Sequence, residues 1–279
     1  MPRRGTARSA DTPDVLDQLV AGAVEDAGVR ERARALSLVE ADALAARPPL
    51  DALALLAPRD TVHVIAEIKR ASPSKGPLAE ITDPASLAAA YERGGASAIS
   101  VLTEGRRFLG SLADLEAVKA SVGIPVLRKD FIATDYQVFE ARAAGADLVL
   151  LIVAALDDPT LRRLHDRVVS LGMTPLVEVH SAEEADRAAH LGAALVGVNA
   201  RDLSAFELDT SLFGRLVTRL NPGTIAVAES AVQTPADVRR YRDDGADVVL
   251  VGEALVRDGD PEAGVRSFID ATDASSPAA

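Results

Sequence analysis

The chain has 279 residues, of which 48% are hydrophobic and only 3% aromatic, so its core must be built mainly from Ala, Val, Leu and Ile. A net charge of −12 argues against a nucleic-acid partner, because phosphate backbones recruit basic surfaces. The absence of cysteine excludes disulfides, thiol nucleophiles and thiolate metal sites, and no run approaches the ~18 apolar residues of a membrane span.

The first 50 residues predict a tail followed by a helical extension. Residues 1–12 are small and polar and carry no apolar segment of the kind that a secretory signal needs, so we expect a disordered tail and a cytoplasmic protein. Helical spacing of apolar residues predicts a helix from Pro13 onward. The apolar face of this helix carries Leu16, Leu19, Val20, Ala23 and Val24. An alanine-rich helix is expected next, from about Ser37 to Arg47, where two prolines end it.

Residues 51–270 predict eight strands that alternate with helices. An apolar, β-rich run at 62–69 is the first strand, and residues 84–93 form the helix after it. Four later segments each join a helix end, a Gly-Ala pair and an apolar strand; they are residues 94–102, 144–153, 191–199 and 244–252. The three remaining strands are expected at 124–130, 174–179 and 224–230.

The glycines of the four repeated segments recur at similar distances. They are Gly95, Gly145, Gly192 and Gly245, spaced by 50, 47 and 53 residues, and each is expected to end its helix in the left-handed conformation. Eight similar units without a G-x-G-x-x-G fingerprint favour an α/β fold of the closed (β/α)8 TIM barrel type over a doubly wound sheet. We expect a tail and helical extension at 1–50, the barrel at 51–270, and a flexible tail at 271–279.

Charged residues stand at the carboxyl ends of alternate predicted strands, where TIM barrels carry their active sites. They are Glu67 and Lys69 on the first strand, then Lys129, Glu178 and Glu229, to which the strand at 191–199 adds Asn199 and the nearby Arg201. The alternation of side chains puts each charged residue on the same face as an apolar inner neighbour. A salt bridge at the rim would explain any one of these residues, but six charged residues that converge on one mouth predict catalysis.

The residue types at this mouth indicate proton transfer and phosphate binding. A lysine beside carboxylates in a partly dry pocket can have its pKa tuned for proton donation near neutral pH. The four histidines are scattered, so no metal site is indicated, and His180 is expected to have a rim or helix-cap role. Ser230 and Gly252, in the loops after the last two strands, offer small side chains and amides to a phosphate, with Lys69 as countercharge.

Together these residues resemble the indole-3-glycerol phosphate synthase family. The stretches that carry the resemblance are VIAEIKRASPSKG (64–76), SVLTEGRRFLGS (100–111), PVLRKDFI (125–132), EARAAGAD (140–147), LVEVH (176–180), VGVNARDL (196–203) and VAES (227–230). The resemblance spans residues 14–268. It implies a decarboxylating lyase of tryptophan biosynthesis that needs no cofactor. Such an enzyme closes a pyrrole ring on 1-(2-carboxyphenylamino)-1-deoxyribulose 5-phosphate and releases carbon dioxide and water.

The resemblance also implies roles for individual residues. Lys129 matches the general acid that acts on the substrate's carbonyl oxygen, and Glu178 the carboxylate that takes or relays protons. Glu67 matches a third catalytic carboxylate, and Lys69 a residue that meets the phosphate and donates a proton in dehydration. Other substrate-contacting positions are Ser72, Asn199, Arg201, Glu229 and Ser230, and the apolar wall against the anthranilate ring is Phe108, Phe131 and Leu150.

Two positions depart from the family's pattern. Ala231 stands where the family usually has glycine, which matters only where a positive φ is required. Glu253 follows Gly252 where a small polar residue is common. A carboxylate that points toward a bound phosphate weakens binding, whereas one that points away favours the start of the next helix.

Two other functions fit parts of the sequence. A neighbouring phosphate-barrel isomerase would use a Cys–Asp type pair, which a chain without cysteine cannot supply. A non-catalytic paralogue that binds a phosphorylated sugar would need only the phosphate loops, so the presence of Glu67, Lys129 and Glu178 together argues against it. We expect a phosphorylated small-molecule substrate, no metal, nucleic-acid or membrane partner, and a monomer or weak homo-oligomer.

Overall fold

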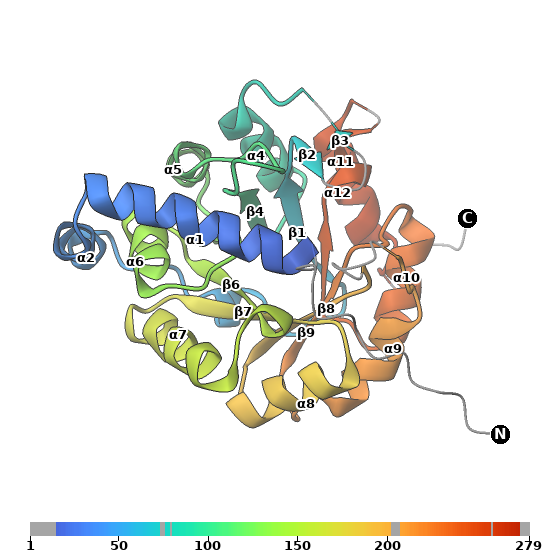
Figure 1. Ribbon diagram of the computed structural model, residues 1–279. Coiled ribbons are helices and arrows are strands. Elements are labelled where there is room, and N and C mark those ends of the chain that lie inside the picture. The colour runs from blue at the N-terminus through green and yellow to red at the C-terminus, as the bar shows by residue number, and fades with distance from the viewer. Residues whose placement is uncertain (1–14, 73–75, 79, 202–206, 258, 274–279) are drawn as a thin grey trace.

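Eight parallel strands close into a barrel in the order β1-β10-β9-β8-β7-β6-β5-β4, which confirms the predicted TIM barrel (Figure 1). The computed structural model describes residues 15–72, 76–78, 80–201, 207–257 and 259–273. The strands are β1 (His63–Ile68), β4 (Ala98–Leu102), β5 (Val126–Lys129), β6 (Leu148–Ile152), β7 (Thr174–Val179), β8 (Leu195–Asn199), β9 (Ile225–Glu229) and β10 (Val248–Val251). The predicted tail at 1–12 lies outside the described residues, as does most of the one at 271–279.

Helices surround the barrel and cover the outer face of the sheet (Figure 1). They are α4 (Pro84–Arg93), α5 (Leu112–Ser121), α6 (Asp135–Ala143), α7 (Asp158–Ser170), α8 (Ala182–Leu191), α9 (Leu212–Leu216), α10 (Pro235–Asp243), α11 (Glu253–Val256) and α12 (Pro261–Asp270). Most begin at a side chain that accepts a hydrogen bond from a first-turn amide, as Asp83, Ser111, Thr134, Asp157, Ser181, Thr234 and Asp260 do. Among the described residues, none of the helices is both long and apolar enough to cross a bilayer.

The four repeated glycines adopt the left-handed conformation that the sequence predicts. Gly95, Gly145, Gly192 and Gly245 all have positive φ, between 79° and 100°. A residue with a Cβ is strained in this conformation, so glycine allows the chain to leave each helix and enter the next strand at once. The repeat therefore fixes where β4, β6, β8 and β10 begin.

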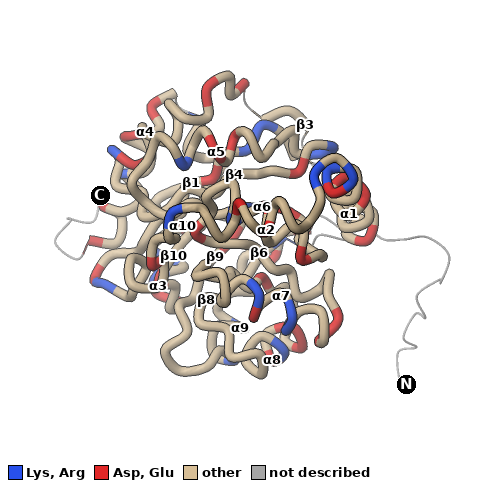
Figure 2. Tube along the Cα trace, turned by 90° about the vertical axis from the view of Figure 1, so that its left-hand side faces the viewer, with Lys and Arg blue, Asp and Glu red and all other residues tan. Residues whose placement is uncertain are grey.

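Three helices precede the first strand, and two of them close the ends of the barrel. α1 (Val15–Ala33) crosses the mouth, while α3 (Ala52–Leu55) lies at the opposite end (Figures 1 and 2). α2 (Leu36–Ala45) packs beside α6. Leu16, Leu19 and Ala23 of α1 join the cluster that fills the barrel interior, as Ala52 and Leu56 do from the other end. The extension is thus part of the core.

Two expectations about this region were wrong. Val24 was assigned to the buried face of the first helix, but it is 37% exposed and lies toward the solvent side of α1. The four-residue helix α3 was not expected, because one turn is too short to show helical periodicity. Its position is set by Asp51, whose side chain accepts a hydrogen bond from the amide of Ala54 at 3.0 Å. The predicted start at Pro13 lies outside the described residues.

Strand alternation aims the charged residues into the barrel mouth. The interior cluster holds Ile65, Leu127, Leu176 and Val227, each two residues before one of the charged strand ends. Ala66, Val177 and Ala228, one residue on, belong to the cluster between sheet and helices. Glu67, Lys129, Glu178 and Glu229 therefore continue the inner columns to the carboxyl ends of their strands.

The first strand is followed by a feature that its sequence did not predict. β2 (Ala71–Ser72) and β3 (Gly76–Pro77) pair antiparallel directly after Lys69 and Arg70. Their connection, residues 73–75, lies outside the described residues and belongs to the stretch at 64–76 that carries the family resemblance. The short pair places Ser72 at the edge of the mouth.

Candidate active site

Every residue that the sequence assigned to catalysis or substrate binding lines one cavity at the carboxyl ends of the strands. These residues are Glu67, Lys69, Ser72, Phe108, Lys129, Phe131, Leu150, Glu178, Asn199, Arg201, Glu229, Ser230 and Gly252. They come from strands or loops all around the barrel, so closure of the sheet is what brings them together. The lining combines charged and polar groups with aromatic and aliphatic ones.

Lys129, the last residue of β5, lies between two buried carboxylates. Its Nζ is 2.7 Å from Oε2 of Glu178 and 3.1 Å from Oε2 of Glu229, and each glutamate side chain is only 1% exposed. Burial lowers the pKa of Lys129, but the charges of Glu178, Glu229 and Glu67 outweigh it and raise the pKa overall. The sequence suggested a pKa tuned toward neutrality, whereas the carboxylates instead keep the ammonium protonated.

The two carboxylates beside Lys129 differ in their protonation. Burial would raise the pKa of Glu178, but Lys129 and the nearby His180 hold it well below its usual value. Burial raises the pKa of Glu229 to about 8, and the negative charge of Glu178 adds to this effect. Among the described residues, neither carboxylate oxygen of Glu229 accepts a hydrogen bond of regular geometry, although Oε2 lies within ion-pair distance of Lys129. The site thus pairs a carboxylate whose pKa is lowered with one whose pKa is raised, an arrangement suited to acid–base chemistry.

His180 contributes more to the site than the sequence predicted. Its backbone amide donates to Glu184 in the first turn of α8 at 2.8 Å, which agrees with the expected helix-cap role. Its Nε2 also lies 3.2 Å from Oε1 of Glu178. Burial lowers the pKa of His180, but Glu178 and Glu184 raise it to about 10. The signal was in the sequence, since residues 178 and 180 share one face of an extended segment.

Glu67 and Lys69 form an ion pair at the end of β1, which stands across the closed barrel from β7. The side chain of Glu67 is 6% exposed and that of Lys69 is 23% exposed, so the lysine faces the opening. Gly252 leaves room for this pair, because a Cβ on it would lie only 2.9 Å from Oε1 of Glu67. Glycine is therefore required where β10 meets the first strand.

Asn199 and Ser230 connect the ends of β8 and β9. The hydroxyl of Ser230 donates to Oδ1 of Asn199 at 2.8 Å, and the same oxygen accepts from the backbone amide of Arg201 at 3.0 Å. Ser230 and Ala231 both have positive φ, of 62° and 56°. The condition that makes the alanine matter is therefore met, because glycine would adopt this backbone conformation without strain.

The second departure from the family's pattern lies at the start of α11. Glu253 lines the cavity, and its carboxylate lies 3.7 Å from the guanidinium of Arg257, one turn further along the helix. Oriented toward Arg257, the carboxylate is partly neutralised and occupies the first turn, where negative charge is favourable.

The apolar side of the cavity is held by a residue that the sequence did not reveal. The rings of Phe108 and Phe131 lie 6.0 Å apart, and Leu150 packs in the same cluster. The buried carboxylate of Glu104 accepts hydrogen bonds from three consecutive backbone amides, residues 106–108, at 2.7–2.9 Å. These bonds fix the loop that carries Phe108. An acidic residue two positions after the strand at 94–102 was the only sequence signal.

The donor groups around the mouth do not form a metal site. Within the described part of the chain, no group of three or more His, Asp or Glu side chains could hold a metal ion. The carboxylates that gather at the centre surround the ammonium of Lys129 instead.

Comparison with known proteins identifies relatives of nearly full length. A family model described as "Indole-3-glycerol phosphate synthase" matches residues 16–268. A protein of that name from Leifsonia xyli subsp. xyli is 67% identical over 255 residues, which cover 91% of this chain and 98% of the relative. One from Mycobacteroides abscessus is 56% identical and covers 92% of this chain and 94% of its own length.

Solved structures share the fold at low sequence identity. A 3-hexulose-6-phosphate synthase from Salmonella typhimurium has a TM-score of 0.61 and 17% identity over 76% of this chain and 98% of its own. A thiamine phosphate pyrophosphorylase from Pyrococcus furiosus has a TM-score of 0.58 and 14% identity over 76% of this chain and 96% of its own. At this identity the likeness concerns the barrel alone.

Proposed function

Since the chain belongs to the indole-3-glycerol phosphate synthase family, we propose that it carries out this reaction with the residues of its cavity. The substrate is 1-(2-carboxyphenylamino)-1-deoxyribulose 5-phosphate, and the products are indole-3-glycerol phosphate, carbon dioxide and water. The observation that carries the proposal is the ammonium of Lys129 between two buried carboxylates, in the same cavity as the rings of Phe108 and Phe131.

Ring closure is assigned to Lys129. The ring carbon that bears the substrate's carboxylate attacks the ribulose carbonyl carbon, and the carbonyl oxygen must receive a proton as the new bond forms. Lys129 holds that proton at the centre of the mouth, and its positive charge stabilises the developing negative charge on oxygen. Phe108, Phe131 and Leu150 support the aromatic ring, so that the two carbons meet in the reactive orientation.

The later steps need a base and a second acid. Loss of carbon dioxide restores the aromatic ring, and loss of the new hydroxyl as water then completes the pyrrole. Glu178 is ionised and lies at the same centre, so it is assigned as the group that takes and relays protons. Lys69 is assigned as the acid that protonates the leaving hydroxyl, and its partner Glu67 as the third catalytic carboxylate.

The phosphate is assigned to the side of the mouth formed by β1, β9 and β10. Lys69 supplies positive charge there, while Ser230 and the amide of Gly252 supply hydrogen-bond donors. Ser72, Asn199, Arg201 and Glu229 are assigned to the remaining substrate contacts. This division leaves the phosphate and the aromatic ring on different sides of Lys129.

The chain's own composition provides the test. It has no tryptophan and three tyrosines, so its own fluorescence is weak and indole emission from the product should rise clearly above it. The rise should match carbon dioxide release one for one and should survive exhaustive chelation of divalent metals. A dephosphorylated substrate should lose turnover as well as affinity, because remote binding energy also positions the reacting carbons. The Lys69→Ala variant should respond less than the wild type to that loss.

Two outcomes would redirect the proposal. Substrate binding with no indole emission would favour a non-catalytic paralogue that binds phosphorylated sugars. Equal turnover with and without the phosphate would remove the assignment of Lys69, Ser230 and Gly252 while leaving the chemistry of Lys129 in place.

We also propose that the protein acts in the cytoplasm as a monomer or weak homo-oligomer. Every residue of the assigned site comes from one chain, so a monomer or weak homo-oligomer suffices for activity. A phosphorylated substrate is charged and does not cross membranes unaided, which favours a cytoplasmic location. Sedimentation over a range of concentrations and cell fractionation test these two statements.

A further inference from the structure

A fully buried guanidinium lies directly beside the catalytic centre and is not used in the proposed mechanism. Arg128 precedes Lys129 on β5, so its side chain points to the outer face of the sheet, where it is 0% exposed. Its register partners on the neighbouring strands are Val101 and Val149, and apolar residues fill this layer elsewhere. Packing alone would therefore be served by an apolar residue at this position.

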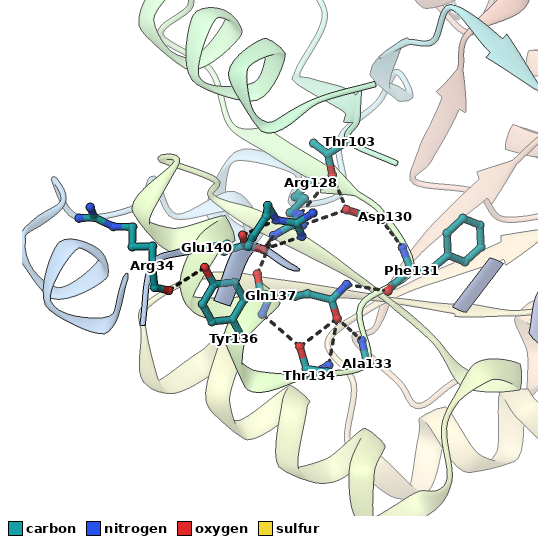
Figure 3. Close-up of polar contacts among 11 residues, drawn as sticks. Arg34, Thr103, Arg128, Asp130, Phe131, Ala133, Thr134, Tyr136, Gln137 and Glu140 are labelled. Carbon is teal, nitrogen blue, oxygen red and sulfur yellow. Dashed lines mark hydrogen bonds and ion pairs between the residues drawn. The ribbon is translucent and has the colours of Figure 1, made fainter. Parts of the chain in front are cut away.

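The contacts of Arg128 converge on the segment after Lys129. Its guanidinium donates to Oδ2 of Asp130 at 2.9 Å, to the hydroxyl of Thr103 at 3.2 Å and to the backbone carbonyl of Gln137 at 2.7 Å (Figure 3). Thr103 in turn donates to the same oxygen of Asp130 at 2.6 Å. Arg128 thus ties the end of β4 and the start of α6 to the residues that flank Lys129.

The network ends on Phe131, a residue of the aromatic wall. Oδ1 of Asp130 accepts from the backbone amide of Phe131 at 2.8 Å, and Nε2 of Gln137 donates to its carbonyl at 3.0 Å. Both backbone polar groups of Phe131 are therefore held by side chains, as Figure 3 shows. The other end of the Gln137 amide accepts from the amides of Ala133 and Thr134, which completes the turn into α6.

The charges of this network balance. Asp130 and Glu140 face Arg128, whose Nη1 lies 3.6 Å from Oε2 of Glu140. Glu140 also receives two hydrogen bonds from Arg30 of α1, at 2.6 and 2.9 Å. Two guanidinium groups and two carboxylates thus compensate one another. The side chain of Arg30 is 38% exposed, but Arg128, Asp130 and Glu140 are buried, and an unpaired charge among them would be strongly destabilising. Helix α1 is joined by this chain of contacts to the backbone beside Lys129.

We propose that Arg128, Asp130 and Gln137 are positioning residues that hold Phe131 against the aromatic ring of the substrate. The proposal rests on the assignment of Phe131 to the aromatic wall in the proposed function. None of the three side chains needs to touch the reacting atoms. Their effect is to keep the ring of Phe131 in one place while Lys129, two residues earlier in the chain, acts on the carbonyl.

The sharpest test exchanges a single group in the Gln137 side chain. The Gln137→Glu variant keeps an oxygen that accepts from residues 133 and 134, but replaces the donor to the Phe131 carbonyl by a second oxygen. We expect its dissociation constant for indole-3-glycerol phosphate to rise roughly tenfold, as for a lost hydrogen bond whose partner is left facing an acceptor. The dissociation constant for glycerol 3-phosphate, which has no ring, should stay within about twofold.

A double-mutant cycle separates positioning from mere stability. In the Phe131→Leu background the Gln137→Glu exchange should change kcat/KM by less than about twofold, because the ring that it positions is already absent. The Asp51→Asn variant, which keeps the cap of α3 at the far end of the barrel, is the control and should leave both ligands unaffected. Should Gln137→Glu not fold, Thr103→Val removes the hydroxyl between Arg128 and Asp130 and should weaken product binding about threefold.

The outcomes are distinguishable. Equal weakening of both ligands, or the same loss of kcat/KM with and without the Phe131 ring, would overturn the positioning role while the wild type remains active. A wild type that makes no product would overturn the proposed function, and the positioning role with it.

Discussion

A single methyl group on β8 should disable the acid–base centre. Gly197 lies beside Glu229, and an ideal Cβ on it would come within 1.9 Å of Oε1 and 3.0 Å of Cδ of that glutamate. In the Gly197→Ala variant the carboxylate must retreat by roughly 1.5 Å to reach an ordinary non-bonded separation. Since Oε2 of Glu229 is only 3.1 Å from Nζ of Lys129, this retreat changes the environment of the catalytic ammonium.

The crowding around Glu229 determines how much the Gly197→Ala exchange should lower the stability and kcat. Glu229 is buried and Leu176 already lies 3.4 Å from the new Cβ, so the free energy of unfolding should fall by about 1–3 kcal/mol, as for other overpacked cores. The value of kcat should fall by roughly 10²-fold, the loss expected when a reacting group moves by about 1 Å. Urea unfolding followed by circular dichroism measures the first quantity, and indole emission the second.

Two further variants serve as controls for this prediction. In Gly28→Ala the new Cβ meets nothing closer than 3.5 Å within helix α1, so the unfolding free energy should be unchanged or higher by about 0.5–1 kcal/mol, with normal kcat. In the Glu229→Ala background, the Gly197→Ala exchange should cost less than about 0.5 kcal/mol, because the clashing carboxylate is absent. Normal kcat in the Gly197→Ala variant would refute the reasoning about this contact.

Further predictions concern the chemistry, the backbone and the pH dependence. Lys129→Ala and Glu178→Gln should each lower kcat by at least ~10²-fold, measured by indole emission, and near-normal turnover in either would contradict its role. Ala231→Gly should raise the free energy of unfolding by about 1 kcal/mol in urea titrations, because φ is 56° at this residue; an unchanged midpoint would mean that the loop absorbs the strain. The carboxylates of Glu178 and Glu184 outweigh burial and raise the pKa of His180 from 6.5 to about 10, whereas burial and the charge of Glu178 raise that of Glu229 from 4.5 to about 8. A raised pKa contributes stability below the unfolded value that is lost as pH rises through the folded one, so the unfolding free energy should fall from pH 6.5 to pH 10. The His180→Ala variant should show a shallower fall, and an equal slope in both proteins would exclude His180 as its source.

The barrel could be predicted because its signals are local and repeated. Gly95 and its three counterparts mark where a helix ends and a strand begins, and two-residue alternation then decides which side chains face inward. Residues as distant as Glu67 and Glu229 could be assigned to one mouth on this basis, since a closed sheet has only one carboxyl end.

What the sequence could not predict depends on partners from several elements. In the sequence Arg128 is only a charged residue within an apolar strand. Its role could not be predicted because its partners Asp130, Gln137 and Thr103 come from three places that only the fold brings together. The raised pKa of Lys129 likewise depends on how closely buried carboxylates approach it, which strand alternation does not specify.

The contact between Arg30 and Glu140 has a consequence for synthesis of the chain. The two residues are 110 positions apart, so at ribosomal rates the first helix emerges roughly 5–20 s before its partner on α6. During that interval Leu16, Leu19 and Ala23 have no barrel interior to enter. The nascent chain therefore exposes an apolar helical face at least until β5 and α6 have been made, which makes α1 a natural binding segment for chaperones.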